Sequence, residues 1–184
     1  MAKKIKFTSP FGTARYPHIS SPDTKGKYAD NKYKTKLVFP IDDPAANAMV
    51  ERINEACKEI HGNLKNKYVP AEIDEEAGEI ILTAKSHYAP AVFDGRGNAA
   101  KGVQVGGGSV IRLMGNLVEF DKGISLQLNQ VQIKELNGFG TCGFEAIDDG
   151  YEYSAEDASF QQGRTADSGE DEDTGTANGS ALEI

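Results

Sequence analysis

The sequence predicts a mainly β protein, a small closed or half-closed barrel with one inserted helix and an acidic C-terminal tail. Three observations predict this fold class: several segments alternate apolar and polar residues, one segment has helical spacing, and residues 163–180 contain no large apolar side chain. The 184 residues suffice for one domain with a core. We therefore expect a folded domain at 1–138, an aromatic and acidic connecting segment at 139–162, and a disordered tail at 163–184.

The first clear strand covers residues 32–39, where lysines alternate with apolar or aromatic residues. Successive side chains of a strand point to opposite faces. Lys32, Lys34 and Lys36 should therefore form a cationic stripe on one face, while Phe39 and its alternates face the core.

The helix signal begins at Asp43-Pro44, an N-cap residue followed by a proline at the first helical position. Apolar residues then recur at spacings of three and four as far as Leu64, so we expect a helix at about 43–64. Cys57 lies on this apolar stripe, which favours a buried structural thiol over a nucleophile.

The later strands complete the predicted barrel. Residues 79–85 form a short apolar strand, and residues 109–120 and 123–136 form a hairpin whose turn contains Gly123, a residue free to take positive φ. The alternation changes phase near Asn129–Gln130, which predicts a β-bulge. Bulges bend strands where a sheet must curl, and this favours a barrel.

Charge is divided unevenly along the chain. Residues 1–140 hold 19 Lys and Arg against 16 Asp and Glu, whereas residues 141–184 hold one Arg against 12 acids. This split is typical of a polyanion-binding body with an acidic interaction tail, but an ordinary solvated surface followed by a solubility tail has the same composition. The sequence has no apolar span, no secretory signal and only two cysteines, so we expect a cytosolic protein with reduced thiols.

Signals for catalysis are weak. The three histidines and two cysteines lack metal-ligand spacing, residues 105–109 lack the lysine of a phosphate-binding loop, and no nucleophile elbow occurs. We expect no enzyme activity, no cofactor and no metal. Two alternatives stay open: a metal-dependent nuclease that uses scattered carboxylates, and an adaptor whose acidic tail is its only functional part.

Signals for nucleic-acid binding are stronger. In the first 39 residues, lysines that neutralise phosphates are interleaved with aromatic residues that stack on bases. The stripe of Lys32, Lys34 and Lys36 is the sharpest element, and Tyr28 and Tyr33 are candidate stacking residues. The same pattern also fits aromatic residues in the core and lysines that protect a wet sheet edge from aggregation.

Several short segments, in the same order along nearly the whole chain, match segments of a known protein family. They are residues 1–5, 7–9 and 12–14, Tyr33-Lys34, Asp43-Pro44, Tyr88-Ala89, Gly106-Gly107-Gly108-Ser109, Leu126-Gln127-Leu128 running to Glu135-Leu136, and the acidic tail. Together they resemble the single-stranded DNA-binding proteins of short-tailed bacteriophages. The resemblance implies an OB-fold, a five-stranded Greek-key barrel. It also implies a non-enzymatic protein that coats single strands during phage DNA replication, recombination and repair in the cytoplasm of the infected bacterial host.

The resemblance also implies individual DNA contacts. Lys3 matches a basic position of the family that contacts DNA, Arg112 falls on a basic position, and Phe120 aligns with a tyrosine that stacks on bases. Lys85 falls near a basic cluster of the family, and Lys32 stands in place of a loop arginine.

For the tail, the resemblance implies competition with DNA for the groove and docking of the phage DNA polymerase and helicase or primase, in a protein that tends to be a homodimer. A flexible polyanion can occupy a basic groove when DNA is absent. The residues expected to act in this way are Asp167, Glu170, Asp171, Glu172, Asp173 and Glu183, with Leu182 and Ile184 at the end of the chain where the family's best-known tail ends in an aromatic residue.

Overall fold

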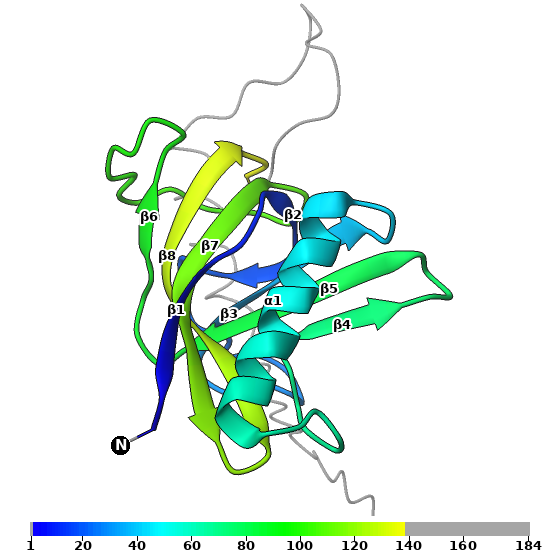
Figure 1. Ribbon diagram of the computed structural model, residues 1–184. Coiled ribbons are helices and arrows are strands. Elements are labelled where there is room, and N and C mark those ends of the chain that lie inside the picture. The colour runs from blue at the N-terminus through cyan, green and yellow to red at the C-terminus, as the bar shows by residue number, and fades with distance from the viewer. Residues whose placement is uncertain (1, 139–184) are drawn as a thin grey trace, which may run out of the picture. The chain divides into compact units, whose positions relative to one another are not determined.

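The computed structural model describes residues 2–138 as one barrel with one helix (Figure 1). The elements, in chain order, are β1 (Lys4–Thr8), β2 (Gly12–His18), β3 (Tyr33–Pro40), α1 (Pro44–His61), β4 (Ala71–Asp74), β5 (Glu79–Ser86), β6 (Ala91–Phe93), β7 (Val110–Phe120) and β8 (Gly123–Glu135).

Five strands close the barrel. β2 pairs with β3, β3 with β5, β5 with β8, β8 with β7, and β7 returns to β2. The β5–β8 pair is parallel and the other four are antiparallel. β1 pairs with residues 114–118 of β7, on the same edge where β2 pairs with Val110 and Ile111. β1 and β2 therefore act as one long strand that is interrupted between Thr8 and Gly12. This closed five-stranded barrel confirms the predicted fold.

The alternation read from the sequence separates the core from the surface. On β3, Thr35, Leu37 and Phe39 are buried, and Lys36, which lies between Thr35 and Leu37, is exposed. Ile80 and Leu82 of β5 alternate in the same way and complete this side of the core. The predicted cationic face of β3 therefore points away from the barrel interior.

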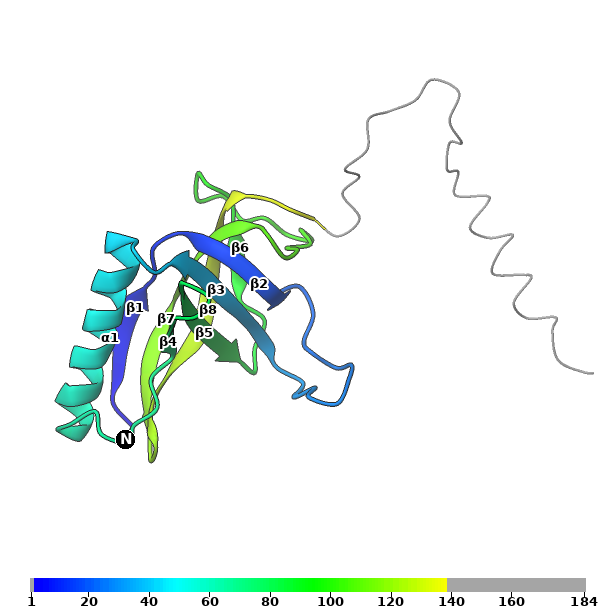
Figure 2. The ribbon, with the colours of Figure 1, turned by 90° about the vertical axis from the view of Figure 1, so that its right-hand side faces the viewer.

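Helix α1 begins as predicted. The carboxylate of Asp43 accepts a hydrogen bond from the Ala45 N–H at 2.9 Å, and Pro44 is the first helical residue. The helix ends at His61 rather than near Leu64, because Gly62 adopts the left-handed conformation (φ 78°) that terminates helices. The buried face of α1 includes Cys57 and covers one side of the barrel beside β1, opposite the loop that joins β2 to β3 (Figure 2).

The β7–β8 hairpin contains the predicted bulge. Met114 pairs with Gln130 and Gly115 pairs with Leu128, so Asn129 is the additional residue. A side chain at Gly115 would place its Cβ 1.9 Å from the Gln127 carbonyl oxygen, so only glycine permits this close approach. Together the bulge and the glycine bend the two longest strands around the barrel.

The connecting segment 139–162 and the tail 163–184, with all their candidate docking residues from Asp167 to Ile184, lie outside the described residues. Within residues 2–138, no helix is long and apolar enough to cross a membrane.

Candidate nucleic-acid interface

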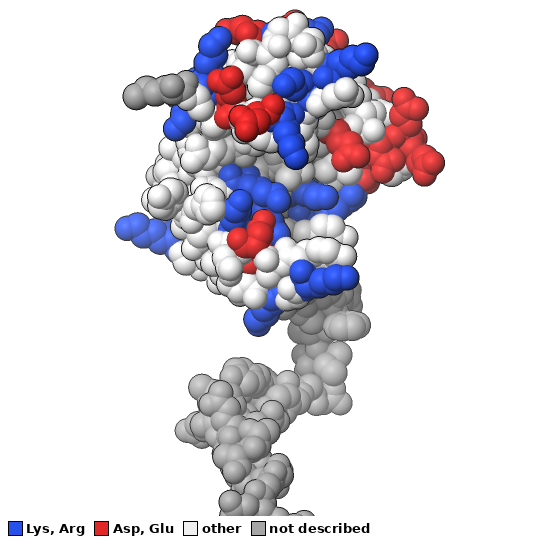
Figure 3. Space-filling view, turned by 90° about the horizontal axis from the view of Figure 1, so that it is seen from below, with Lys and Arg blue, Asp and Glu red and all other residues white. Residues whose placement is uncertain are grey.

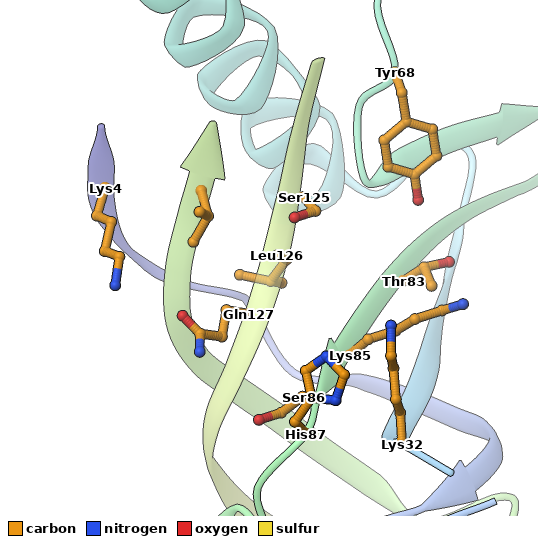
Figure 4. Close-up of a pocket in the computed structure, with 11 residues that line it drawn as sticks. Lys4, Lys32, Tyr68, Thr83, Lys85, Ser86, His87, Ser125, Leu126 and Gln127 are labelled. Carbon is orange, nitrogen blue, oxygen red and sulfur yellow. The ribbon is translucent and has the colours of Figure 1, made fainter. Parts of the chain in front are cut away.

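A groove crosses the outer face of the barrel over β3 and β5. It consists of two adjoining cavities that share Tyr68, Thr83 and Lys85. The larger cavity, about 980 Å³, extends under the loop of residues 19–32 between β2 and β3. The smaller one extends to β8 and to Lys4 of β1 (Figure 4). Below, "the groove" means these two cavities together.

Lysines line the groove along its length. From below, Lys and Arg side chains gather around a hollow in this face (Figure 3). The groove lysines come from three separate parts of the sequence, and they are Lys4, Lys25, Lys32, Lys34, Lys36 and Lys85. Figure 4 shows Lys32, Lys85 and His87 at the end of the smaller cavity away from Tyr68. The barrel therefore assembles a cationic surface that extends well beyond the predicted stripe of β3.

Two of these lysines face each other and share a carboxylate. Lys34 of β3 and Lys85 of β5 are direct register partners, an arrangement in which like charges repel. Asp30 lies between them, with its carboxylate oxygens 3.2 Å from the Lys34 Nζ and 3.5 Å from the Lys85 Nζ. Lys34 is also 2.6 Å from the carboxylate of Asp23. Lys34 is thus held by two acids, whereas Lys85 keeps half of its side chain exposed.

These ion pairs fasten the loop to the sheet. The Asp23 N–H donates to the Lys32 carbonyl at 2.9 Å, and the Asn31 N–H donates back to the Asp23 carbonyl at 2.9 Å, which closes the base of the loop. The hydrogen bond from Lys34 lowers the pKa of Asp23, and the same bond raises the pKa of Lys34. Both groups are therefore charged at neutral pH.

Exposed aromatic side chains lie in and beside the groove. Tyr28, on the loop, is 82% exposed. Tyr68, where the two cavities meet, and its neighbour Phe120, which lines neither cavity, are 48% and 39% exposed, with ring centroids 6.0 Å apart and a tilt of 60° between the planes. Proteins that bind single-stranded nucleic acids stack bases on exposed aromatic rings of this kind, next to lysines that contact the phosphates.

Gly123 brings Tyr68 and Phe120 together. The Tyr68 N–H donates to the Lys122 carbonyl at 2.8 Å, and the Ile124 N–H donates to the Tyr68 carbonyl at 3.0 Å. A Cβ on Gly123 would lie 2.1 Å from the Tyr68 carbonyl oxygen, so this contact requires glycine. The predicted freedom of Gly123 is real (φ 148°), but its main use is this close approach.

Tyr68 lines the groove, although no sequence pattern predicted it as a site residue. It lies in the loop between α1 and β4, where no periodicity predicts which side chains meet the sheet. The available signal was a tyrosine next to Lys67 in a polar loop, which is the same signal that marked Tyr28. Lys4 was also not selected, although it lines the groove and its neighbour Lys3 does not.

Four predicted residues line neither cavity of the groove, and they are Lys3, Tyr33, Arg112 and Phe120. Lys3 pairs with Glu119 through its backbone at 3.0 Å, and Tyr33 is half-buried at the start of β3. Arg112 lines a separate cavity, where its guanidinium carbon is 4.9 Å from the centre of the Phe11 ring. The structure therefore brings five of the predicted residues together in the groove: Tyr28, Lys32, Lys34, Lys36 and Lys85. Phe120 lies next to Tyr68 but outside the two cavities, and Lys3, Tyr33 and Arg112 are also outside them.

No protein-family model and no curated protein sequence matches this chain, but solved structures do. One is gp2.5, a single-stranded DNA-binding protein encoded by bacteriophage T7, which is 26% identical with a TM-score of 0.61 and covers 83% of this chain and 100% of its own. The chain is similar to a phage single-stranded DNA-binding protein. This confirms the resemblance found in the sequence.

The single-stranded DNA-binding protein of bacteriophage Enc34 shares the fold. Its C-terminal truncation is 19% identical, with a TM-score of 0.52 over 73% of this chain and 86% of that chain. Its complex with single-stranded DNA is 18% identical, with a TM-score of 0.51 over 74% of this chain and 89% of that chain.

Among residues 2–138, no three His, Cys, Asp or Glu side chains cluster in a way that would hold a metal ion.

Proposed function

We propose that the chain binds single-stranded DNA without sequence preference. The observation that carries this proposal is the groove, in which several lysines lie next to exposed aromatic rings. Lysines neutralise phosphates and rings stack on bases of any identity, so the two together recognise a strand rather than a sequence. The similarity to gp2.5 supports the same function.

The groove lysines differ in how available they are to phosphates. Among the described residues, Lys4, Lys25, Lys32 and Lys36 form no ion pair, whereas Lys34 is held by Asp23 and Asp30. If DNA binding neutralises about four phosphates, the logarithm of the affinity should fall with the logarithm of salt concentration with a slope of about −3.

The aromatic residues favour a single strand over a duplex. Stacking on Tyr28, Tyr68 or Phe120 needs a base whose face is free, and in a duplex both faces are covered by neighbouring bases. Burial, with a smaller contribution from Glu72, raises the pKa of the Tyr68 hydroxyl. Tyr68 is therefore neutral at physiological pH and does not repel the phosphates beside it.

The biological setting follows from the resemblance. We place the protein in phage DNA replication, recombination and repair, in the cytoplasm of the infected host and without catalytic activity of its own. The acidic tail competes with DNA for the groove, and the tail docks the phage polymerase and helicase or primase when DNA displaces it. Lys3 and Arg112 remain proposed contacts that a longer strand would reach outside the groove, and a homodimer remains part of the proposal.

Fluorescence anisotropy with a labelled thymidine oligonucleotide tests the body and the tail together. Residues 1–184 and 1–163 are compared at low and moderate salt, with unlabelled duplex as competitor. Salt-sensitive binding, poor competition by duplex and tighter binding by 1–163 at low salt are expected, because screening weakens a charged tail. Absence of binding by both forms would favour the adaptor, and cleavage of the oligonucleotide with magnesium would favour the nuclease.

A further inference from the structure

The edge of β2 next to the groove contains a β-bulge at Tyr16-Pro17. Arg15 pairs with Lys36 and His18 pairs with Lys34, so β2 uses one more residue than β3 over the same stretch. Pro17 has no N–H to donate to a ladder, and prolines inside sheets are confined to edges and bulges. The bulge therefore has a local cause in the sequence.

The bulge reverses the direction of the Tyr16 side chain. Gly12 and Ala14 are buried, so strict alternation would place Tyr16 in the barrel interior as well. Instead Tyr16 is 73% exposed, and Pro17 is buried in its place. Bulges redirect side chains in this way, and they are common next to functional sites.

The exposed position strains the backbone. Tyr16 has a φ of 50°, one of three positive values among the non-glycine residues from 2 to 138. The left-handed region is unfavourable for a bulky side chain, and the proline that follows favours an extended conformation at Tyr16 instead. The other two such residues are Asn31 and Asn66, and asparagine adopts this conformation readily. Strained residues of this kind cluster at functional sites.

The Tyr16 side chain lines the larger cavity of the groove, together with Tyr28 and Lys36. It is not held by partners inside the fold: among the described residues, its hydroxyl makes no hydrogen bond and its ring forms no aromatic pair. We propose that Tyr16 is a base-stacking residue, exposed by the β2 bulge so that a single strand crossing β3 meets a ring there. This inference rests on the proposed function.

Substitution at Tyr16 separates a stacking role from a structural one. Tyr16→Asn removes the ring but suits the left-handed backbone, so we expect single-stranded DNA affinity to fall about 5- to 150-fold while the unfolding midpoint stays equal to or above that of the wild type. Tyr16→Phe keeps a ring and should retain the wild-type affinity. Tyr88→Asn is the matched control, because Tyr88 is 78% exposed and lines neither cavity of the groove.

A spectroscopic measurement adds a readout that folding alone does not change. The chain has no Trp, so its intrinsic emission comes from tyrosine, and a base stacked on Tyr16 quenches part of it. Tyr16→Phe should bind normally but show less quenching on titration with unlabelled thymidine oligonucleotide. Unchanged affinity of Tyr16→Asn, or a parallel loss of affinity and stability, would overturn the inference while the proposed function stands. If the wild type itself binds no strand, both fall together.

Discussion

Two faces of this barrel place aromatic rings next to cations, and they do so in different ways. In the groove, Tyr28 and Tyr68 are 82% and 48% exposed. The second surface, below called the β7 face, consists of Phe11, Arg112 of β7 and Lys134 of β8. There the half-buried Phe11 ring has the Arg112 guanidinium 4.9 Å from its centre and the Lys134 ammonium 5.8 Å from it. Groove rings are open to solvent, whereas the Phe11 ring is already occupied by cations of its own fold.

The comparison shows that residue types alone do not define a binding surface. Arg112 also donates a hydrogen bond from Nε to the Gln132 side chain at 2.7 Å, so its guanidinium is engaged on two sides. A phosphate at Arg112 would have to compete with both contacts, while one at Lys36 would meet an exposed lysine that forms no ion pair among the described residues. Availability, rather than the presence of cations and rings, distinguishes the groove.

Charge reversal on each face is the strongest test of this difference. Lys32→Glu with Lys36→Glu should lower single-stranded DNA affinity about 100-fold at about 50 mM salt, because two phosphate contacts are lost. Arg112→Glu with Lys134→Glu changes the net charge equally and, with an oligonucleotide short enough to stay within the groove, should lower affinity less than about threefold. Anisotropy titrations of both double variants check the prediction, and equal losses would show that the strand also runs over the β7 face.

Ring removal tests the aromatic half of the comparison. Tyr68→Ala deletes the partner of Phe120 and one stacking surface, so affinity should fall about tenfold. The backbone hydrogen bonds of Tyr68 do not depend on its side chain, so the hairpin contact should survive. Phe11→Ala is the counterpart on the β7 face and should leave affinity unchanged. A wild-type affinity for Tyr68→Ala would show that the part of the groove around Tyr68 does not bind the strand.

The sequence predicted those features that depend on local patterns. Alternation identified the outer face of β3, Asp43-Pro44 marked the start of α1, and a phase change located the bulge at Asn129. Each of these follows from neighbours within a few residues, which is the range over which strand and helix periods act.

What the sequence did not predict depends on contacts between distant segments. No pattern indicates that Asp30 lies between Lys34 and Lys85, because that contact depends on the register of β3 and β5 and on the path of a loop. Tyr68 reaches the site through the turn at Gly123, which is far along the chain. The resemblance indicated Arg112 only by its position in the sequence. It did not indicate that the Arg112 guanidinium packs against the Phe11 ring.

Substitution of Asp30, the acid between Lys34 and Lys85, should have smaller effects, which are opposite in sign for stability and for DNA affinity. Asp30→Asn leaves Lys34 and Lys85 facing each other without a shared carboxylate, so the unfolding midpoint should fall. The same change frees Lys85 for phosphates and leaves Lys34 with Asp23 alone, so affinity should rise about threefold at about 50 mM salt. Asp42→Asn removes an equal charge at an exposed position outside the groove and should change neither quantity. A fall in both stability and affinity for Asp30→Asn would mean that Asp30 shapes the groove rather than competing with DNA.

The smallest expected effect is the pH dependence of the loop clamp. Because Lys34 lowers the pKa of Asp23 in the folded state, the unfolded chain binds more protons as the pH falls below about 4, the ordinary value for aspartate. The stabilisation is therefore complete above that pH and is lost as the pH falls through the lower folded pKa. Thermal unfolding between about pH 5 and pH 3 should show a shallower decline for Asp23→Asn than for the wild type. Lys34→Gln should flatten the profile at least as much, since Lys34 also lowers the pKa of Asp30 against the opposing effect of burial. If the Asp23→Asn profile stays as steep as the wild type, hydrogen bonds of the loop backbone, rather than this ion pair, hold the loop against β3.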